Sequence, residues 1–166
     1  MNTALFYASS TGNTQDVAKR IISSLGVDIK SFDIANDGYD AINDFDKIIL
    51  GVSTWGEGEL QDDWEDIWTD FCELDFSGKT IALFGLGDQE GYADEFVDAL
   101  GIIYEQVQNS GGNVIGFTST DGYEHDSSKA ELNGEFVGLV VDEDNQDDMT
   151  DERIEKWTNS IKNLII

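Results

Sequence analysis

Strand-like segments alternate with amphipathic helical patterns along this chain, and the alternation restricts the possible folds more than any other feature. The five strand-like segments lie at residues 3–7, 27–34, 47–52, 80–86 and 114–118. Apolar residues at helical spacing occur in residues 13–25, 60–74, 96–107 and 154–164. Short apolar strands that alternate with amphipathic helices are typical of a parallel sheet covered by helices on both faces. The pattern therefore predicts an α/β fold.

Two segments depart from this alternation. Residues 35–45 (ANDGYDAINDF) predict only a short or irregular helix. Residues 116–141 place a polar stretch, TDGYEHDSSKAELNGE, between the fifth apolar run and a further strand-like run, FVGLVV. Two interpretations stay open there: an additional hairpin, or one edge strand that is interrupted by a long loop. A length of 166 residues without internal repeats or a linker favours one domain over residues 1–166.

The charge of the chain excludes several classes of partner. It has 35 Asp and Glu against 9 Lys and Arg, a formal net charge of -26. Nucleic acid and anionic membranes are excluded, because both require a basic surface. A basic protein partner, and general solubility or adaptation to salt, are both compatible with such acidity. We expect a cytoplasmic protein, because the sequence shows no signal peptide, no membrane-spanning stretch and the single cysteine Cys72.

Polar and glycine-rich segments follow three of the strand-like segments. SSTGNT follows the first, STWGEGE the third and GLGDQEGY the fourth. In open parallel α/β sheets, ligands bind at the carboxyl ends of the strands. The three segments are therefore expected to form one ligand site.

The segment SSTGNT, residues 9–14, has the properties of a phosphate site. Its hydroxyl groups can donate hydrogen bonds, Gly12 tolerates a positive φ, and a helix that begins near Asn13 adds its positive end. No charged residue precedes Asp16, so the segment keeps carboxylates away from an anion. It matches neither the Walker A pattern nor GxGxxG. The alternative is an ordinary Ser or Thr helix cap.

Trp55 and Tyr92 are large aromatic residues in glycine-rich segments at strand tips. Exposure of such side chains is unfavourable without a binding partner. Two aromatic rings from neighbouring loops can enclose a planar ring between them. The alternative is that each covers an edge of the core. A phosphate site beside an aromatic pair indicates a flat, phosphorylated ligand.

These motifs together resemble the flavodoxin family over essentially the whole chain. SSTGNT fits the family pattern T/S-x-T-G-x-T, STWGEGELQDDW resembles the loop of the inner aromatic, and GLGDQEGYADEF resembles the loop of the outer tyrosine. The segment from residue 120 to 157 resembles the long-chain subgroup, in which a loop splits the fifth strand. The resemblance implies a doubly wound, five-stranded parallel sheet in the order 2-1-3-4-5, an order that flavodoxin itself exemplifies.

The family resemblance also implies a function. Flavodoxins bind FMN non-covalently and carry single electrons between proteins, so the chain is expected to be a low-potential carrier rather than an enzyme. It would cycle chiefly between the semiquinone and hydroquinone states in place of ferredoxin. The resemblance also implies a monomer. Its redox partner would be a ferredoxin–NADP reductase-like enzyme, a photosystem, nitrogenase or a pyruvate oxidoreductase.

The resemblance assigns expected roles to the residues of these motifs. Ser9 to Thr14 would hold the phosphate, Trp55 would stack on the inner face of the flavin, and Tyr92 would stack on the outer face. Backbone N–H groups around Gly87 and Asp88 would meet the pyrimidine edge, and the backbone near Gly56 and Glu57 would meet N5. Asp144 would approach the ribityl chain. The full expected set is Ser9, Ser10, Thr11, Gly12, Asn13, Thr14, Ser53, Thr54, Trp55, Gly56, Glu57, Gly58, Leu86, Gly87, Asp88, Tyr92 and Asp144.

Three other functions fit the residues less well. An NAD(P)H quinone reductase with the same fold would need an Arg cluster for the phosphates of the dinucleotide, and the sequence has none. A response-regulator receiver would need acidic residues where Ala8, Ser9 and Ser53 stand. A flavin-free interaction domain would not need Trp55 and Tyr92. The single histidine, His125, is expected at the surface, with no metal site.

Overall fold

The computed structural model describes residues 2–55 and 57–166. Its central sheet is built on β1 (Thr3–Tyr7), β2 (Lys30–Asp33), β3 (Lys47–Trp55), β5 (Thr80–Leu86), β6 (Asn113–Ile115) and β10 (Leu139–Val141). These strands pair in parallel, and the two-residue β4 (Glu59–Leu60) adds an antiparallel pairing to β3. The order β2-β1-β3-β5-β10 confirms the predicted doubly wound sheet.

The fifth strand position is shared by two short strands. β6 pairs with Thr80–Ala82 at the start of β5, and β10 pairs with Phe84–Leu86 at its end. A long insertion separates the two halves and forms its own antiparallel sheet in the order β7-β9-β8, from β7 (Thr118–Ser119), β8 (Glu131–Leu132) and β9 (Glu135–Phe136). Both interpretations that the sequence left open therefore hold, because the edge strand is interrupted and the interruption contains a hairpin.

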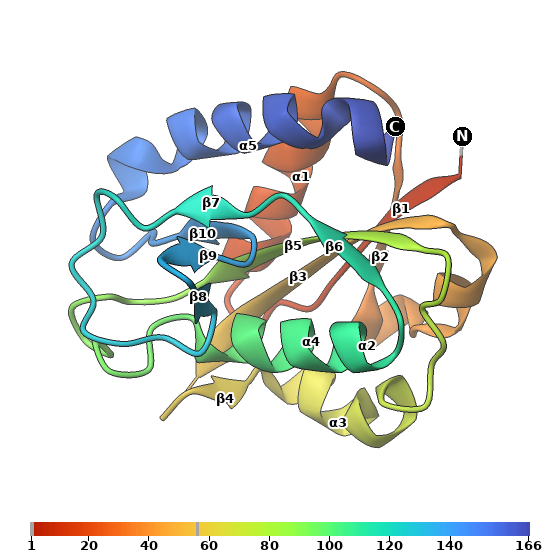
Figure 1. The fold of residues 1–166 in the computed structure, drawn as a ribbon, viewed down its shortest axis with the longest axis horizontal. Coiled ribbons are helices and arrows are strands. Elements are labelled where there is room, and N and C mark those ends of the chain that lie inside the picture. Colours follow the sequence, from red (N-terminus) through yellow and green to blue (C-terminus); the bar gives the residue numbers. More distant parts are fainter. Residues whose placement is uncertain (1, 56) are drawn as a thin grey trace.

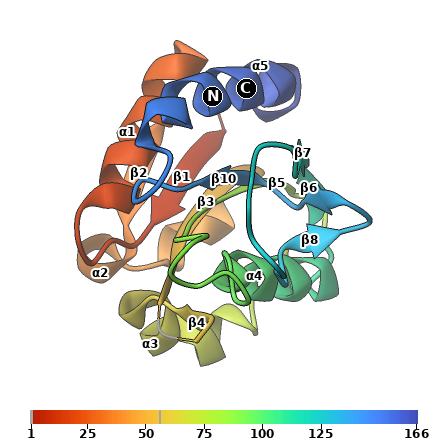
Figure 2. The ribbon, with the colours of Figure 1, turned by 90° about the vertical axis from the view of Figure 1, so that its left-hand side faces the viewer.

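Helices cover both faces of the sheet, as predicted (Figure 2). α1 (Asn13–Leu25) and α5 (Thr150–Ile165) lie on one face, where their apolar residues pack with Leu5, Ile49 and Phe84. α3 (Asp62–Phe71) and α4 (Asp98–Asn109) lie on the other, where Trp64 and Leu100 pack with Phe6. Residues 35–45 form only the short α2 (Ile34–Asp37) and the 3-10 helix η1 (Asp40–Asp44), as expected, and a second 3-10 helix, η2 (Asp147–Met149), precedes α5.

The insertion packs closely on α4 and on the segment before it. A Cβ atom at Gly101 would collide with the backbone of Lys129, so only glycine permits this approach. The ring of His125 lies 5.3 Å and 5.2 Å from the rings of Phe96 and Phe136 in tilted arrangements, and its Nε2 atom lies 2.7 Å from the carboxylate of Glu131. The side chain of His125 is only 7% exposed. Its expected surface position was therefore wrong, because aromatic packing of the insertion encloses the ring.

Among the described residues, no helix is long and apolar enough to span a membrane. In the same part of the chain, no group of three His, Cys, Asp or Glu side chains is arranged to hold a metal ion.

Candidate functional site

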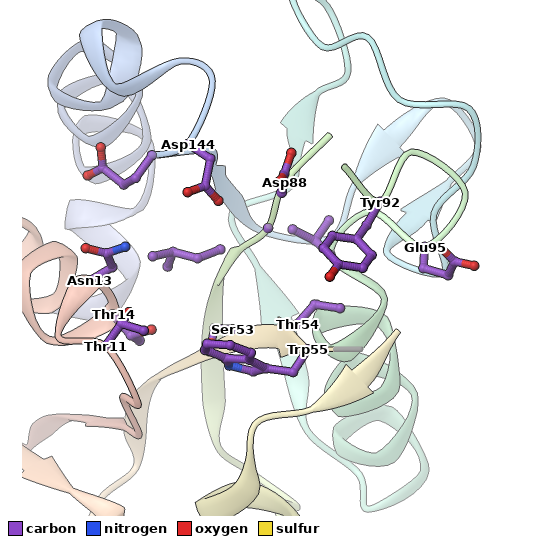
Figure 3. A pocket seen from close by; sticks show the side chains of 14 residues that line it. Thr11, Asn13, Thr14, Ser53, Thr54, Trp55, Asp88, Tyr92, Glu95 and Asp144 are labelled. Atoms are coloured by element: carbon purple, nitrogen blue, oxygen red, sulfur yellow. The ribbon is translucent and has the colours of Figure 1, made fainter. Parts of the chain in front are cut away.

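A hollow of about 260 Å³ opens at the carboxyl ends of β1, β3 and β5. Figure 3 shows Thr11, Asn13 and Thr14 along one side, with Trp55 below and Tyr92 and Glu95 on the opposite side. Asp88 and Asp144 lie above. The lining residues are Thr11, Asn13, Thr14, Ser53, Thr54, Trp55, Leu86, Gly87, Asp88, Tyr92, Glu95, Val97, Glu143 and Asp144. The strand-end segments therefore meet at one site, as the sequence predicted.

The turn from β1 into α1 presents unpaired backbone donors. Gly12 has φ 92°, a left-handed conformation that favours glycine, and is the N-cap of α1 without a side-chain cap. The expected alternative of a Ser or Thr cap is therefore wrong. Within residues 2–55 and 57–166, the N–H groups of Asn13, Thr14 and Gln15 make no hydrogen bond. Such a helix N-terminus is suited to an anion.

Two serine hydroxyls of the same turn have internal partners. Ser9 Oγ accepts a hydrogen bond from the N–H of Gly12 at 2.9 Å. Ser10 Oγ accepts from Nε2 of the buried Gln61 at 2.8 Å, which connects this turn to the start of α3. Ser9, Ser10 and Gly12 consequently shape the turn, and they are not among the residues that line the hollow.

The two aromatic residues of the site are exposed to an extent that is unusual for large apolar side chains. Trp55 is 42% exposed and Tyr92 is 48% exposed, and both line the hollow. Trp55 Nε1 donates to Ser53 Oγ at 2.9 Å, which fixes the indole relative to β3. Because neither ring is buried in the core, the alternative that they cover a core edge is wrong for both.

The turn after β5 differs from one detail of the prediction. Gly87 lines the hollow, but its N–H donates to the carbonyl of Val141 at 3.2 Å and is not available to a ligand. The N–H of Asp88 has no acceptor among the described residues. The carboxylate of Asp88 accepts from the N–H groups of Glu90 and Gly91, and the hydrogen bond from Gly91 is the main cause that lowers its pKa. Of these two N–H groups, only that of Asp88 is thus free of a partner among the described residues.

A fully buried carboxylate lies behind this turn. Asp142 Oδ2 accepts from the backbone N–H and the Nε2 atom of Gln89 at 3.1 and 2.7 Å. Its Oδ1 accepts from the N–H groups of Asp144 and Asn145 at 3.1 and 3.0 Å, and Asn145 Nδ2 reaches Oδ2 at 2.9 Å. Gln89 in turn accepts from the N–H of Glu124 in the insertion at 2.6 Å. Asp142 therefore joins the turn after β5 to the loop after β10.

The expected site residues divide into three groups. Eleven of them line the hollow, as the list above shows. Five do not: Ser9, Ser10, Gly12, Glu57 and Gly58. A Cβ atom at Gly58 would lie 2.7 Å from the carboxylate of the buried Asp98. Gly56 lies outside the described residues.

Three lining residues were missed by the sequence interpretation: Glu95, Val97 and Glu143. Val97 has φ 49° directly before α4, a conformation that nothing in an apolar helical pattern indicates. Glu143 is the neighbour of Asp144, and it forms an ion pair with Arg20 at 2.9 Å. Burial, followed by the charges of Asp88 and Asp142, raises the pKa of Asp144.

The deciding observation comes from comparison with known proteins. The family model described as "Flavodoxin" matches residues 5–157. The chain belongs to the flavodoxin family. It is 48% identical to a flavodoxin of Picosynechococcus over 160 residues, covering 95% of this chain and 94% of the relative. It is 44% identical to flavodoxin 1 of Escherichia coli over 161 residues, covering 96% and 92%.

Solved flavodoxin structures agree with this membership. Fusobacterium nucleatum flavodoxin bound to flavin mononucleotide matches with a TM-score of 0.91 at 36% identity, covering 99% of this chain and 98% of that one. A mutant of the same protein, also bound to flavin mononucleotide, matches with a TM-score of 0.94 at 36% identity, covering 99% and 96%. Flavodoxins are electron-transfer proteins that use FMN, and FMN is the cofactor of this flavodoxin.

The residues around the hollow of this flavodoxin suit FMN. The free N–H groups at the start of α1 suit a phosphate, and the two exposed aromatic rings suit the flat ring of the flavin. The set thus combines free N–H donors with exposed aromatic rings, which fits the phosphate and the ring of FMN.

Proposed function

We propose that this flavodoxin is a low-potential one-electron carrier that cycles chiefly between the semiquinone and hydroquinone forms of FMN and replaces ferredoxin between redox proteins. Residues 1–166 would act as one domain of the long-chain subgroup. The observation that carries the proposal is the meeting of unpaired N–H groups at the start of α1 and two exposed aromatic rings at one hollow. The insertion between β6 and β10 supports the subgroup assignment.

The proposed roles follow the chemistry of each segment. The α1 turn binds the phosphate through N–H groups and the hydroxyls of Thr11 and Thr14. Trp55 and Tyr92 enclose the flavin ring, and the N–H of Asp88 meets its pyrimidine edge. Asp144 lies toward the ribityl chain. Gly56 and Glu57 would supply the backbone group that meets N5, where glycine makes a change of carbonyl direction easy.

The low potential follows from charge and aromatic packing. FMN supplies one-electron transfer when it is bound, and its fully reduced form carries a negative charge. Trp55, Tyr92 and nearby carboxylates disfavour that charge, so they lower the second potential. For a one-electron step, a shift of about 59 mV in the potential corresponds to a tenfold change in the equilibrium constant.

Replacement of Trp55 tests the aromatic role. We expect Trp55→Ala to weaken FMN binding by at least about tenfold and to raise the second potential, because stacking contributes about 1 kcal/mol beyond burial. Trp55→Phe, which keeps a ring, should lose less affinity. Fluorescence titration of the apoprotein and potentiometry measure both quantities. Unchanged affinity and potential in Trp55→Ala would remove this residue from the site.

The partner surface is proposed to be the acidic segment beside the hollow. Glu57, Glu59, Asp62, Asp63, Glu65 and Asp66 precede or begin α3, and most of them are exposed. Such a surface attracts a basic redox protein, such as a ferredoxin–NADP reductase-like enzyme, a photosystem, nitrogenase or a pyruvate oxidoreductase. We further propose that the protein acts in the cytoplasm as a monomer.

The electrostatic docking can be tested with salt. The rate at which a basic reductase reduces this flavodoxin should fall as ionic strength rises from about 0.01 to 0.5 M, because screening weakens the attraction between exposed charges. Stopped-flow absorbance gives the rate. A rate that does not depend on ionic strength would contradict docking through the acidic segment.

A further inference from the structure

Arg20 forms most of the ion pairs among the described residues of this acidic protein. The sequence has 9 Lys and Arg, and three of the four ion pairs among residues 2–55 and 57–166 involve Arg20 of α1. The guanidinium lies 3.2 Å from Asp16, 2.9 Å from Glu143 and 2.6 Å from Asp151. These carboxylates come from α1, from the loop after β10 and from the first turn of α5. Arg20 therefore connects three separate segments.

All three guanidinium nitrogens of the Arg20 side chain donate hydrogen bonds in this cluster. Both Nε and Nη2 of Arg20 donate to Asp151 Oδ1, at 3.1 and 2.6 Å. Nη1 donates to Glu143 Oε1 at 2.9 Å and to Asp16 Oδ2 at 3.2 Å. The planar guanidinium can hold several carboxylates in fixed directions, which a lysine ammonium does less well. Glu143 is thus bound directly to Arg20.

The cluster borders the proposed phosphate site. Glu143 lines the hollow together with Thr11, Asn13 and Thr14, and its side chain is only 17% exposed. Asp16 is in the first turn of α1, the turn whose N–H groups are free for an anion. A partly buried carboxylate is screened less by salt than an exposed one. Without a cation beside them, Glu143 and Asp16 would repel the phosphate.

We propose that Arg20 is a positioning residue of the phosphate site, which offsets part of the negative charge of Glu143 and Asp16 and holds Glu143 away from the phosphate. The proposal rests on the phosphate role proposed above for the α1 turn. That turn has no cation of its own, since Asp16 is the first charged residue of the chain. From further along α1, Arg20 then weakens the negative potential that Glu143 and Asp16 create at the phosphate loop.

Arg20→Gln tests this role in the apoprotein, with FMN and riboflavin as ligands. We expect FMN affinity to fall roughly tenfold at low salt, the size of one partly screened unit charge, and less at high salt. Riboflavin affinity should be unchanged, because riboflavin has the same ring but no phosphate. Fluorescence quenching measures both affinities.

Two further variants separate charge from structure. Lys19→Gln removes the same charge from the neighbouring exposed position of α1, and it should leave FMN affinity within about twofold. The double variant Arg20→Gln with Glu143→Gln should recover most of the lost affinity, because the unpaired carboxylate is then absent. Recovery is not expected if Arg20 only fastens α1 to α5.

The outcomes distinguish this inference from the proposed function. Equal loss of FMN and riboflavin affinity in Arg20→Gln, or no loss at all, would overturn the role of Arg20 and leave the FMN site standing. A wild-type apoprotein that binds FMN no better than riboflavin would instead contradict the proposed phosphate site itself.

Discussion

Thr11→Asp is expected to weaken FMN binding by at least about a hundredfold while leaving the apoprotein as stable as before or more stable. Thr11 is exposed and lies directly before the N-cap of α1. A carboxylate there interacts favourably with the helix dipole, by about 0.3–1 kcal/mol. The same carboxylate repels a bound phosphate, and two like charges about 5 Å apart at an effective dielectric constant of about 20 repel by about 3 kcal/mol.

The opposite signs of the two effects make Thr11→Asp informative. Urea unfolding of the apoprotein gives the stability, and fluorescence titration gives the affinity for FMN. Thr11→Asn adds a side chain of similar size without the charge and is the matched control. If Thr11→Asp binds FMN within about threefold of the wild type, the phosphate lies elsewhere. A unit negative charge beside a phosphate must lower the affinity by more than that.

Asp142→Ala is expected to lower the free energy of unfolding of the apoprotein by about 3 kcal/mol or more. The substitution leaves the buried N–H of Gln89 and the part-buried N–H groups of Asp144 and Asn145 without an acceptor, at about 1–3 kcal/mol for a buried unsatisfied group. Because Asp142 joins the turn that carries Asp88 to the loop that carries Asp144, FMN affinity should also fall. Urea unfolding without FMN avoids the stabilisation that a bound ligand adds.

Asp142→Asn is the matched control for the loss of the acceptor. It keeps one oxygen and the volume of the side chain, but it turns an amide donor toward other donors, so its stability should lie between those of Asp142→Ala and the wild type. If Asp142→Ala is destabilised by less than about 1 kcal/mol, the buried carboxylate is not the anchor of the two loops.

The sequence was sufficient to predict the segments that form the site, because each follows a recognisable strand. The alternation of strands and helices implies a parallel sheet, and parallel strands bring their carboxyl ends to one edge. SSTGNT, Trp55 and Tyr92 were located in this way, and all three segments contribute to the hollow.

The remaining features depend on contacts between residues far apart in the chain. The N–H of Gly87 is paired because the register of β5 and β10 places Val141 beside it. Glu143 lines the hollow and is paired with Arg20, 123 residues earlier. His125 is enclosed because Phe96 and Phe136 meet across the insertion. Periodicity and local motifs carry no information on such pairings.

Stepwise anaerobic reduction of the FMN-bound protein, followed by visible absorption, tests the central claim most directly. A one-electron carrier should accumulate the blue neutral semiquinone before the flavin bleaches, with two separated potentials. Passage of bound FMN directly from the oxidised to the fully reduced state, with no one-electron form at any point of the titration, would contradict the account.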